Sequence, residues 1–96
     1  MRITYVIWRR EFVDKIRRKH DVTEDEVEEV FAKHPPVRRI ERGHVEGEDL
    51  YRAIGQTDAG RYLLIIFIYK GQGRAMVVSA RDAESKEIRS HGKRKK

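Results

Sequence analysis

Apolar residues follow two different spacings along the chain, and the spacing changes at the proline pair 35–36. A first run of β-branched and aromatic residues, 3–8, predicts a strand. In the next two segments apolar residues return every three or four positions, which is typical of amphipathic helices. We expect one helix over residues 9–19 and a second from Thr23 to the prolines, with Thr23 and Glu26 forming a capping box.

After the prolines, alternating and continuous apolar runs predict four strands separated by glycine-containing turns. The predicted strands are 37–42, 49–56, 62–69 and 75–79. Segment 62–69 is apolar almost throughout, so we expect it at the centre of the sheet, covered on both faces. Ser79, with Asp82 three residues later, matches the start of a third helix that would run to about Arg89.

These elements follow the order β-α-α-β-β-β-β-α and define an α+β fold. Consecutive strands joined by short turns favour an antiparallel meander, with the helices gathered on one face or at one end. We therefore predict an antiparallel sheet of four to five strands with two N-terminal helices and one C-terminal helix. The 96 residues suffice for one domain, which we place at residues 1–90, followed by a disordered basic tail at 91–96.

The charge balance narrows the range of partners. The formal net charge of +6 favours polyanions such as nucleic acid, although a solvated basic surface is the ordinary alternative. The chain has no cysteine, and its histidines have no metal-ligand spacing to carboxylates, so we expect no disulfide, metal or cofactor. Segment 62–69 is far shorter than the ~20 residues that span a bilayer. With no signal peptide recognisable at the N-terminus, we expect a cytoplasmic protein without membrane contact.

Three segments of the chain resemble the BrnT family of toxins. Lys19-His20-Asp21-Val22, followed by Glu28-Glu29-Val30-Phe31, is similar to the family's "KHGV … EEVF" segment. Residues 48–55, with Arg52 three positions before Gly55, look like a loosened form of its "E-x-R-x-x-x-G" strand. Residues 77–83, followed by Glu87, are similar to its "ISARkA … E" segment, which is the most specific match. The segments occur in the expected order and cover roughly residues 8–89.

The resemblance implies a fold, an activity and partners. BrnT-type proteins are ribonuclease toxins with a RelE-like fold, so it implies the toxin of a type II toxin–antitoxin system, an endoribonuclease that cleaves RNA and inhibits translation. It also implies a ribbon-helix-helix antitoxin, with operator DNA bound only through the antitoxin complex. The chain departs from the family at Asp21, where Gly is usual, and at Ile16, where Asn is common. The alternative is therefore a non-catalytic module of the same fold that binds RNA or the antitoxin.

Cleavage of RNA without a metal needs a base for the 2′-hydroxyl, a cation beside the phosphorane and an acid for the leaving oxygen. Arg81 is the first candidate for the cation. The predicted third helix places it beside free backbone N–H groups that favour phosphate, and its planar guanidinium matches phosphate oxygens. The alternative is an ordinary surface arginine paired with Glu84 or Ser85.

Three further residues are candidates for the chemistry. Arg52 lies on a half-apolar strand face, so it either contacts phosphate or pairs with Glu48 or Glu41. His20 acts as base or acid, or caps the end of the first helix by bonding its last carbonyls. Glu87 acts as base, or it orients an arginine. Cations of the first helix are expected to hold the RNA backbone, namely Lys19, Arg17, Arg18 and Arg10.

Overall fold

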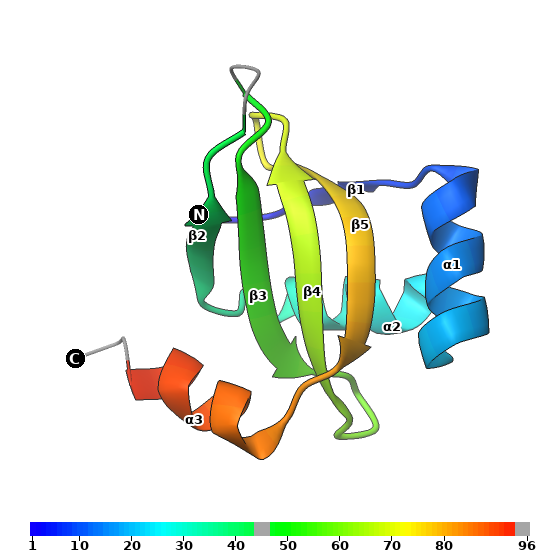
Figure 1. Ribbon diagram of the computed structural model, residues 1–96, viewed down its shortest axis with the longest axis vertical. Coiled ribbons are helices and arrows are strands. Elements are labelled where there is room, and N and C mark those ends of the chain that lie inside the picture. The colour runs from blue at the N-terminus through cyan, green and yellow to red at the C-terminus, as the bar shows by residue number, and fades with distance from the viewer. Residues whose placement is uncertain (44–46, 94–96) are drawn as a thin grey trace.

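The computed structural model describes residues 1–43 and 47–93, and its elements follow the predicted order (Figure 1). The elements are β1 (Tyr5–Ile7), α1 (Arg10–His20), α2 (Glu24–Ala32), β2 (Val37–Glu41), β3 (Leu50–Gln56), β4 (Tyr62–Tyr69), β5 (Arg74–Asp82) and α3 (Ser85–Lys93). Three helices and one five-stranded sheet make the protein an α+β fold, as its sequence predicted.

The strands are arranged in the order β1-β5-β4-β3-β2, with β4 at the centre. The central position of β4 was predicted from its apolar run, and β2 to β5 form the expected antiparallel meander. The predicted antiparallel sheet has one exception, at its edge, where β1 pairs with β5 in parallel, from Tyr5 opposite Arg74 to Ile7 opposite Met76. Two helices and three strands separate β1 from β5, which gives the chain the long crossover that parallel pairing requires.

The main core lies between one face of the sheet and the first two helices; in Figure 1, α2 runs behind the sheet and α1 stands beside β5. Leu63, Ile65 and Phe67 of β4 are completely buried on this face, and Phe67 meets the ring of Phe31 edge-on at 5.3 Å. The opposite face is more open. Alternate residues of β4 point to it, and Ile66 is half-buried there.

The connection from α1 to α2 is a tight turn whose signals are visible in the sequence. Thr23 and Glu26 form the predicted capping box at the start of α2. Asp21 ends α1 in a left-handed conformation with φ of 55°, and its N–H donates to the carbonyl of Arg17 at 3.1 Å. Glycine adopts this conformation most easily. Asp21, which stands where the resembling sequences usually have Gly, is therefore the residue that must adopt the left-handed backbone conformation of this turn.

The third helix begins five residues later than predicted, because its first residue is Ser85, whereas Ser79 was expected as the N-cap of a helix beginning at Ala80. Strand β5 continues through Ser79 and Arg81 to Asp82, which lies opposite Leu63 of β4. The prediction was wrong because the hydrogen-bonded ladder with β4 extends the strand past a sequence that locally resembles a helix cap.

The end of α3 was also predicted wrongly. His91 was expected in the disordered tail, but it belongs to α3, is only 2% exposed and donates from Nε2 to the carbonyl of Pro36 at 2.9 Å. This contact ties α3 to the segment before β2. Residues 94–96 of the predicted tail lie outside the described residues.

Candidate functional site

An open groove of about 540 Å³ lies between the end of α1 and the end of β5. One wall consists of the last residues of α1 and its cap, and the other of the last residues of β5 and the loop that follows. The lining residues are Arg18, Lys19, His20 and Asp21 on the first wall, and Arg81, Asp82, Ala83 and Glu84 on the second. The tertiary structure thus brings four of the predicted site residues, Arg18, Lys19, His20 and Arg81, to one groove.

Arg81 lies in β5, not in the first turn of a helix as the sequence suggested. Its guanidinium makes a two-point ion pair with Glu87 of α3, from Nη1 at 3.0 Å and from Nη2 at 2.7 Å. Nη1 also donates to the carbonyl of Asp82 at 3.0 Å. Among the described residues, the N–H of Nε and the second N–H of Nη2 on the same edge make no hydrogen bond. With the side chain 38% exposed, this edge is available to a ligand with two acceptor oxygens.

Glu87 is held firmly in its ionised form. The hydrogen bonds from Arg81 lower its pKa to about 2, and the backbone N–H of Glu84 and the charges of Arg81 and Arg52 act in the same direction. The N–H of Glu84 donates to Oε1 at 2.9 Å. A carboxylate with so low a pKa is a weak base near neutral pH. The geometry suits Glu87 to fixing the guanidinium of Arg81.

Arg52 lies on the open face of the sheet, opposite Ile66 of β4 on one side and Arg38 of β2 on the other. Neither of the ion pairs considered from the sequence, with Glu41 or Glu48, occurs in the described part of the chain, where Glu48 pairs with Lys70 at 3.5 Å. The Nε of Arg52 is buried and has no hydrogen-bond partner within residues 1–43 and 47–93. A buried donor of this kind is uncommon and costs free energy unless an acceptor arrives.

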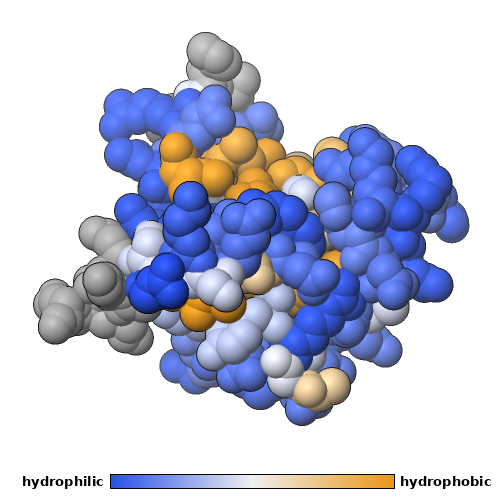
Figure 2. Space-filling view, turned by 60° about the horizontal axis from the view of Figure 1, so that its bottom comes forward, coloured by the Kyte–Doolittle hydropathy of each residue, from blue (hydrophilic) through white to orange (hydrophobic). Residues whose placement is uncertain are grey.

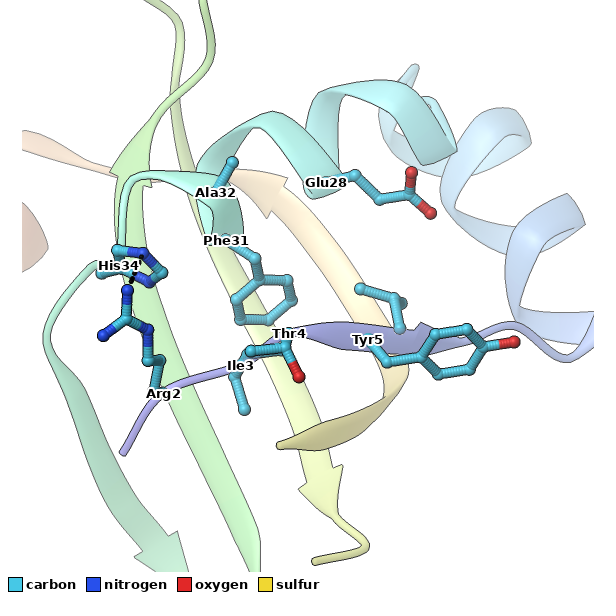
Figure 3. Close-up of a pocket in the computed structure, with 9 residues that line it drawn as sticks. Arg2, Ile3, Thr4, Tyr5, Glu28, Phe31, Ala32 and His34 are labelled. Carbon is cyan, nitrogen blue, oxygen red and sulfur yellow. Dashed lines mark hydrogen bonds between the residues drawn. The ribbon is translucent and has the colours of Figure 1, made fainter. Parts of the chain in front are cut away.

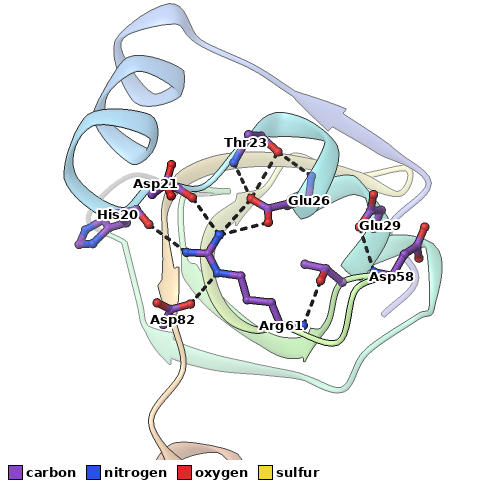
Figure 4. Close-up of polar contacts among 9 residues, drawn as sticks. His20, Asp21, Thr23, Glu26, Glu29, Asp58, Arg61 and Asp82 are labelled. Carbon is purple, nitrogen blue, oxygen red and sulfur yellow. Dashed lines mark hydrogen bonds and ion pairs between the residues drawn. The ribbon is translucent and has the colours of Figure 1, made fainter.

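Arg61 is the residue of this region that the sequence analysis missed, and it makes more polar contacts than any candidate in the groove (Figure 4). Its guanidinium donates to the carbonyls of His20 at 3.0 Å and Asp21 at 2.8 Å, to the Asp82 carboxylate at 2.7 Å, and to both oxygens of Glu26 at 3.1 Å. The only local signal was a charged residue between a turn and an apolar strand, which by itself suggests nothing more than a strand end.

These contacts shift the ionisation of both carboxylates that Arg61 binds. The hydrogen bond from Arg61 lowers the pKa of Asp82, and the charges of Arg61 and His20 reinforce the effect. Burial raises the pKa of Glu26, but hydrogen bonds from the Thr23 N–H and from Arg61 outweigh it, so the pKa lies below its usual value. Both groups are therefore ionised around Arg61 at neutral pH.

Two of the predicted RNA-binding residues lie outside the groove. Arg17 is exposed on α1, and Arg10 lines a smaller hollow of about 270 Å³ with Trp8, Val13 and Glu24. Arg52 and Glu87 do not line the groove either, although Glu87 contacts it through Arg81. No three His, Asp or Glu side chains of the described residues are grouped closely enough to hold a metal ion.

A second cavity, of about 460 Å³, lies on the other side of the core, between the β1 segment and α2 (Figure 3). Ile3 and Phe31 form its apolar part, while Arg2 and His34, 3.2 Å apart, stand at one end. None of the predicted site residues lines it.

The fold and the groove together define a small α+β protein that sets a histidine and several cations around an open cleft. A family profile described as "Ribonuclease toxin, BrnT, of type II toxin-antitoxin system" matches residues 8–87. The chain therefore belongs to the BrnT family of ribonuclease toxins, as its sequence segments indicated. Membership in a type II toxin–antitoxin family implies an RNA substrate and an antitoxin partner.

The fold is shared with a solved structure. The crystal structure of the Brucella abortus ribonuclease toxin BrnT matches with a TM-score of 0.59 and 21% sequence identity, over 85% of this chain and 100% of that chain. No curated protein matches the sequence. None of the helices in the described ranges is long and apolar enough to cross a membrane.

Proposed function

We propose that this protein is an endoribonuclease toxin that cleaves RNA without a metal ion, in the groove between α1 and β5. The observation that carries the proposal is that His20, with Lys19 and Arg18, lines the same groove as Arg81. Of the base, the cation and the acid that such a reaction needs, His20 is a candidate for one of the two proton transfers and the fixed guanidinium of Arg81 is the candidate for the cation.

In the proposed reaction, the 2′-oxygen of one nucleotide attacks the adjacent phosphorus and the bond to the 5′-oxygen breaks. A base removes the 2′-hydroxyl proton and an acid protonates the leaving 5′-oxygen, so the products carry a 2′,3′-cyclic phosphate and a 5′-hydroxyl. His20 is our candidate for one of these two proton transfers, because an imidazole can both accept and donate a proton.

Arg81 is assigned to the phosphorane. Its free Nε–Nη2 edge can donate two parallel hydrogen bonds to phosphate oxygens, while the opposite edge remains bound to Glu87. Of the two roles considered for Glu87, we therefore favour orientation of Arg81 over that of base, because its pKa of about 2 makes it a poor proton acceptor.

Phosphates on either side of the cut are assigned to the cations of α1, with Lys19 and Arg18 in the groove and Arg17 and Arg10 further along the helix. Arg52 is assigned to a phosphate or to an antitoxin carboxylate on the open face of the sheet, which would supply the acceptor that its buried Nε lacks among the described residues. Cutting messenger RNA in the cytoplasm would inhibit translation.

The open face is our candidate for the antitoxin surface. Half-buried apolar residues lie side by side on it, and Figure 2 shows an apolar area bordered by hydrophilic side chains. These residues are Leu50, Ile66, Ile68 and Met76. A partner segment with apolar residues flanked by Asp and Glu would match the strip and the arginines beside it. We propose a ribbon-helix-helix antitoxin, with operator DNA bound through the complex.

The test is cleavage of RNA by the purified protein in EDTA, with the chemistry of the product ends determined. Products with 2′,3′-cyclic phosphate and 5′-hydroxyl ends support the proposal, and His20→Gln should reduce their rate of formation. Loss of cleavage in EDTA, or 5′-phosphate ends, would contradict a reaction carried by side chains alone. RNA binding without cleavage by a fully folded protein would favour the non-catalytic alternative.

A further inference from the structure

We propose that Arg61 is a positioning residue that holds the two walls of the groove at the distance at which His20 and Arg81 act on one phosphate. This inference rests on the proposed function, because it concerns the geometry of that reaction. Arg61 does not line the groove, and its role is exerted through the backbone of one wall and the carboxylate of the other.

The two walls come from distant parts of the sequence, residues 18–21 and 81–84. One guanidinium spans them, because Nη2 and Nη1 bind the carbonyls of His20 and Asp21 while Nε binds Asp82, the neighbour of Arg81. With the Glu26 carboxylate, four different residues accept from one planar group. A shift of either wall breaks or bends at least one of these bonds.

The acceptors on the α1 wall have no partner within the helix. The carbonyls at a helix C-terminus point outward unsatisfied, and a cation placed there is favoured by the helix dipole. Arg61 fills this position for α1. Arg61 also bonds the carboxylate of Glu26, which accepts from the Thr23 N–H at 3.0 Å. The same guanidinium therefore joins the end of α1 to the start of α2. The turn that carries His20 is therefore bound at both of its ends.

The backbone of Arg61 is itself fixed. Thr57 is 3% exposed, its hydroxyl accepts from the N–H of Arg61 at 3.1 Å, and its own N–H donates to the carbonyl of Arg61 at 2.9 Å. Arg61 then leads directly into the central strand β4. The Arg61 side chain therefore extends from a fixed backbone at the start of the most buried strand, so its guanidinium holds a constant position relative to both walls.

The experiment compares wild type with Arg61→Met and Arg61→Lys at a temperature where all are folded. We expect the single-turnover cleavage rate at saturating RNA to fall about 10²-fold in Arg61→Met, as for a displacement of about 1 Å between reacting groups. RNA affinity should change less than about threefold, since the groove cations remain. Arg61→Lys should regain melting temperature more than rate, because one ammonium cannot reach all four acceptors.

A matched control is Arg74→Met. Arg74 also donates to backbone carbonyls, from Nε to Gly71 at 3.0 Å and from Nη2 to Lys70 at 2.8 Å, but it lies at the other end of β5. The Arg74→Met substitution should leave the single-turnover cleavage rate unchanged. A readout independent of activity is the carboxyl pKa of Asp82 by NMR, which should rise toward its usual value in Arg61→Met and stay low in Arg74→Met.

The outcomes separate the two proposals. If wild type cleaves no RNA, the proposed function fails. The positioning role of Arg61 is then still decided by NMR, from the carboxyl pKa of Asp82 and the amide chemical shifts of Asp21 and Val22, compared between wild type and Arg61→Met. A wild-type cleavage rate in Arg61→Met, or an equal loss in Arg74→Met, would overturn the positioning role. If Arg61→Met does not fold, the test rests on Arg61→Lys. A cleavage rate and a melting temperature that both return to the same degree in Arg61→Lys would likewise overturn the positioning role.

Discussion

At the residue scale, the position of Arg81 alters what its substitution should do. In the first turn of a helix it would be an exposed side chain with little effect on stability. In β5 it is partly covered and bound at two points to Glu87, which is 19% exposed. Removing Arg81 leaves this carboxylate partly buried without its main partner, so Arg81→Ala should lower stability as well as activity.

The sharpest test of the chemistry is Arg81→Lys. Lysine keeps the charge but loses the two-point geometry toward both Glu87 and phosphate, so we expect cleavage to slow by about 10²–10³-fold while RNA affinity falls much less. Rates, dissociation constants and melting temperatures of wild type, Arg81→Lys and Glu87→Gln measure this. Glu87→Gln is the comparison variant, because it breaks the ion pair that orients Arg81 while the chain keeps the guanidinium itself. Full activity in Arg81→Ala would remove the residue from the mechanism.

A second test at this scale follows from the lowered pKa of Glu87. Its folded-state pKa of about 2 lies below the ordinary value of 4.5, so the ionised carboxylate stabilises the folded state above about pH 4.5. This contribution is lost as the pH falls from about 4.5 toward 2. Urea unfolding should therefore show Glu87→Gln less stable than wild type at pH 6, with the difference shrinking by pH 3. The exposed Glu11→Gln serves as control, and a difference independent of pH would contradict the assignment.

At the scale of elements, the turn between α1 and α2 combines structural and functional demands. Asp21 holds a left-handed conformation and also places a carboxylate on the groove wall. The left-handed conformation is unfavourable for a residue with a Cβ, and the negative carboxylate repels an approaching phosphate. The residue that the family usually has here, Gly, would relieve both.

We therefore expect Asp21→Gly to raise the free energy of unfolding by about 0.5–1 kcal/mol, the balance between relief of the left-handed strain and greater freedom of the unfolded chain. It should also tighten RNA binding. Chemical denaturation and RNA titration measure the two effects. Asp21→Ala is the control, since it removes the charge but not the strain, so it should tighten binding without the gain in stability. Equal stability in both variants would contradict the conformational argument.

At the scale of the whole molecule, cations stand on both sides of the groove, Arg18 and Lys19 on the α1 wall and Arg81 on the β5 wall, among the carboxylates of Asp21, Asp82 and Glu84. RNA binding should therefore weaken with salt, with a slope of about −3.5 in log K against log salt if each of the five cations assigned to phosphates contributes about 0.7. These cations are Arg10, Arg17, Arg18, Lys19 and Arg81. Lys19→Gln should reduce the slope by about 0.7. Lys33→Gln is the control, because Lys33 pairs with Asp58 at 2.7 Å away from the groove. Binding unchanged between low and physiological salt would refute this mode.

The sequence by itself determined those features that depend on neighbours along the chain. The capping box of Thr23 and Glu26 fixed the start of α2, and the apolar run of β4 fixed the central strand, because both signals lie within a few residues of each other. The family segments also identified Lys19, His20 and Arg81, which the fold brings to one groove.

Only the tertiary structure decided the features that depend on partners far away in sequence. The parallel pairing of β1, the extension of β5 through Arg81 and the burial of His91 all result from contacts with other elements. Arg61 shows the same limit, because its acceptors come from α1, α2 and β5. Arg61 meets these acceptors only because of the strand register and the helix packing. Both depend on the free energy of the whole assembled core, so they cannot be read from any short stretch of sequence.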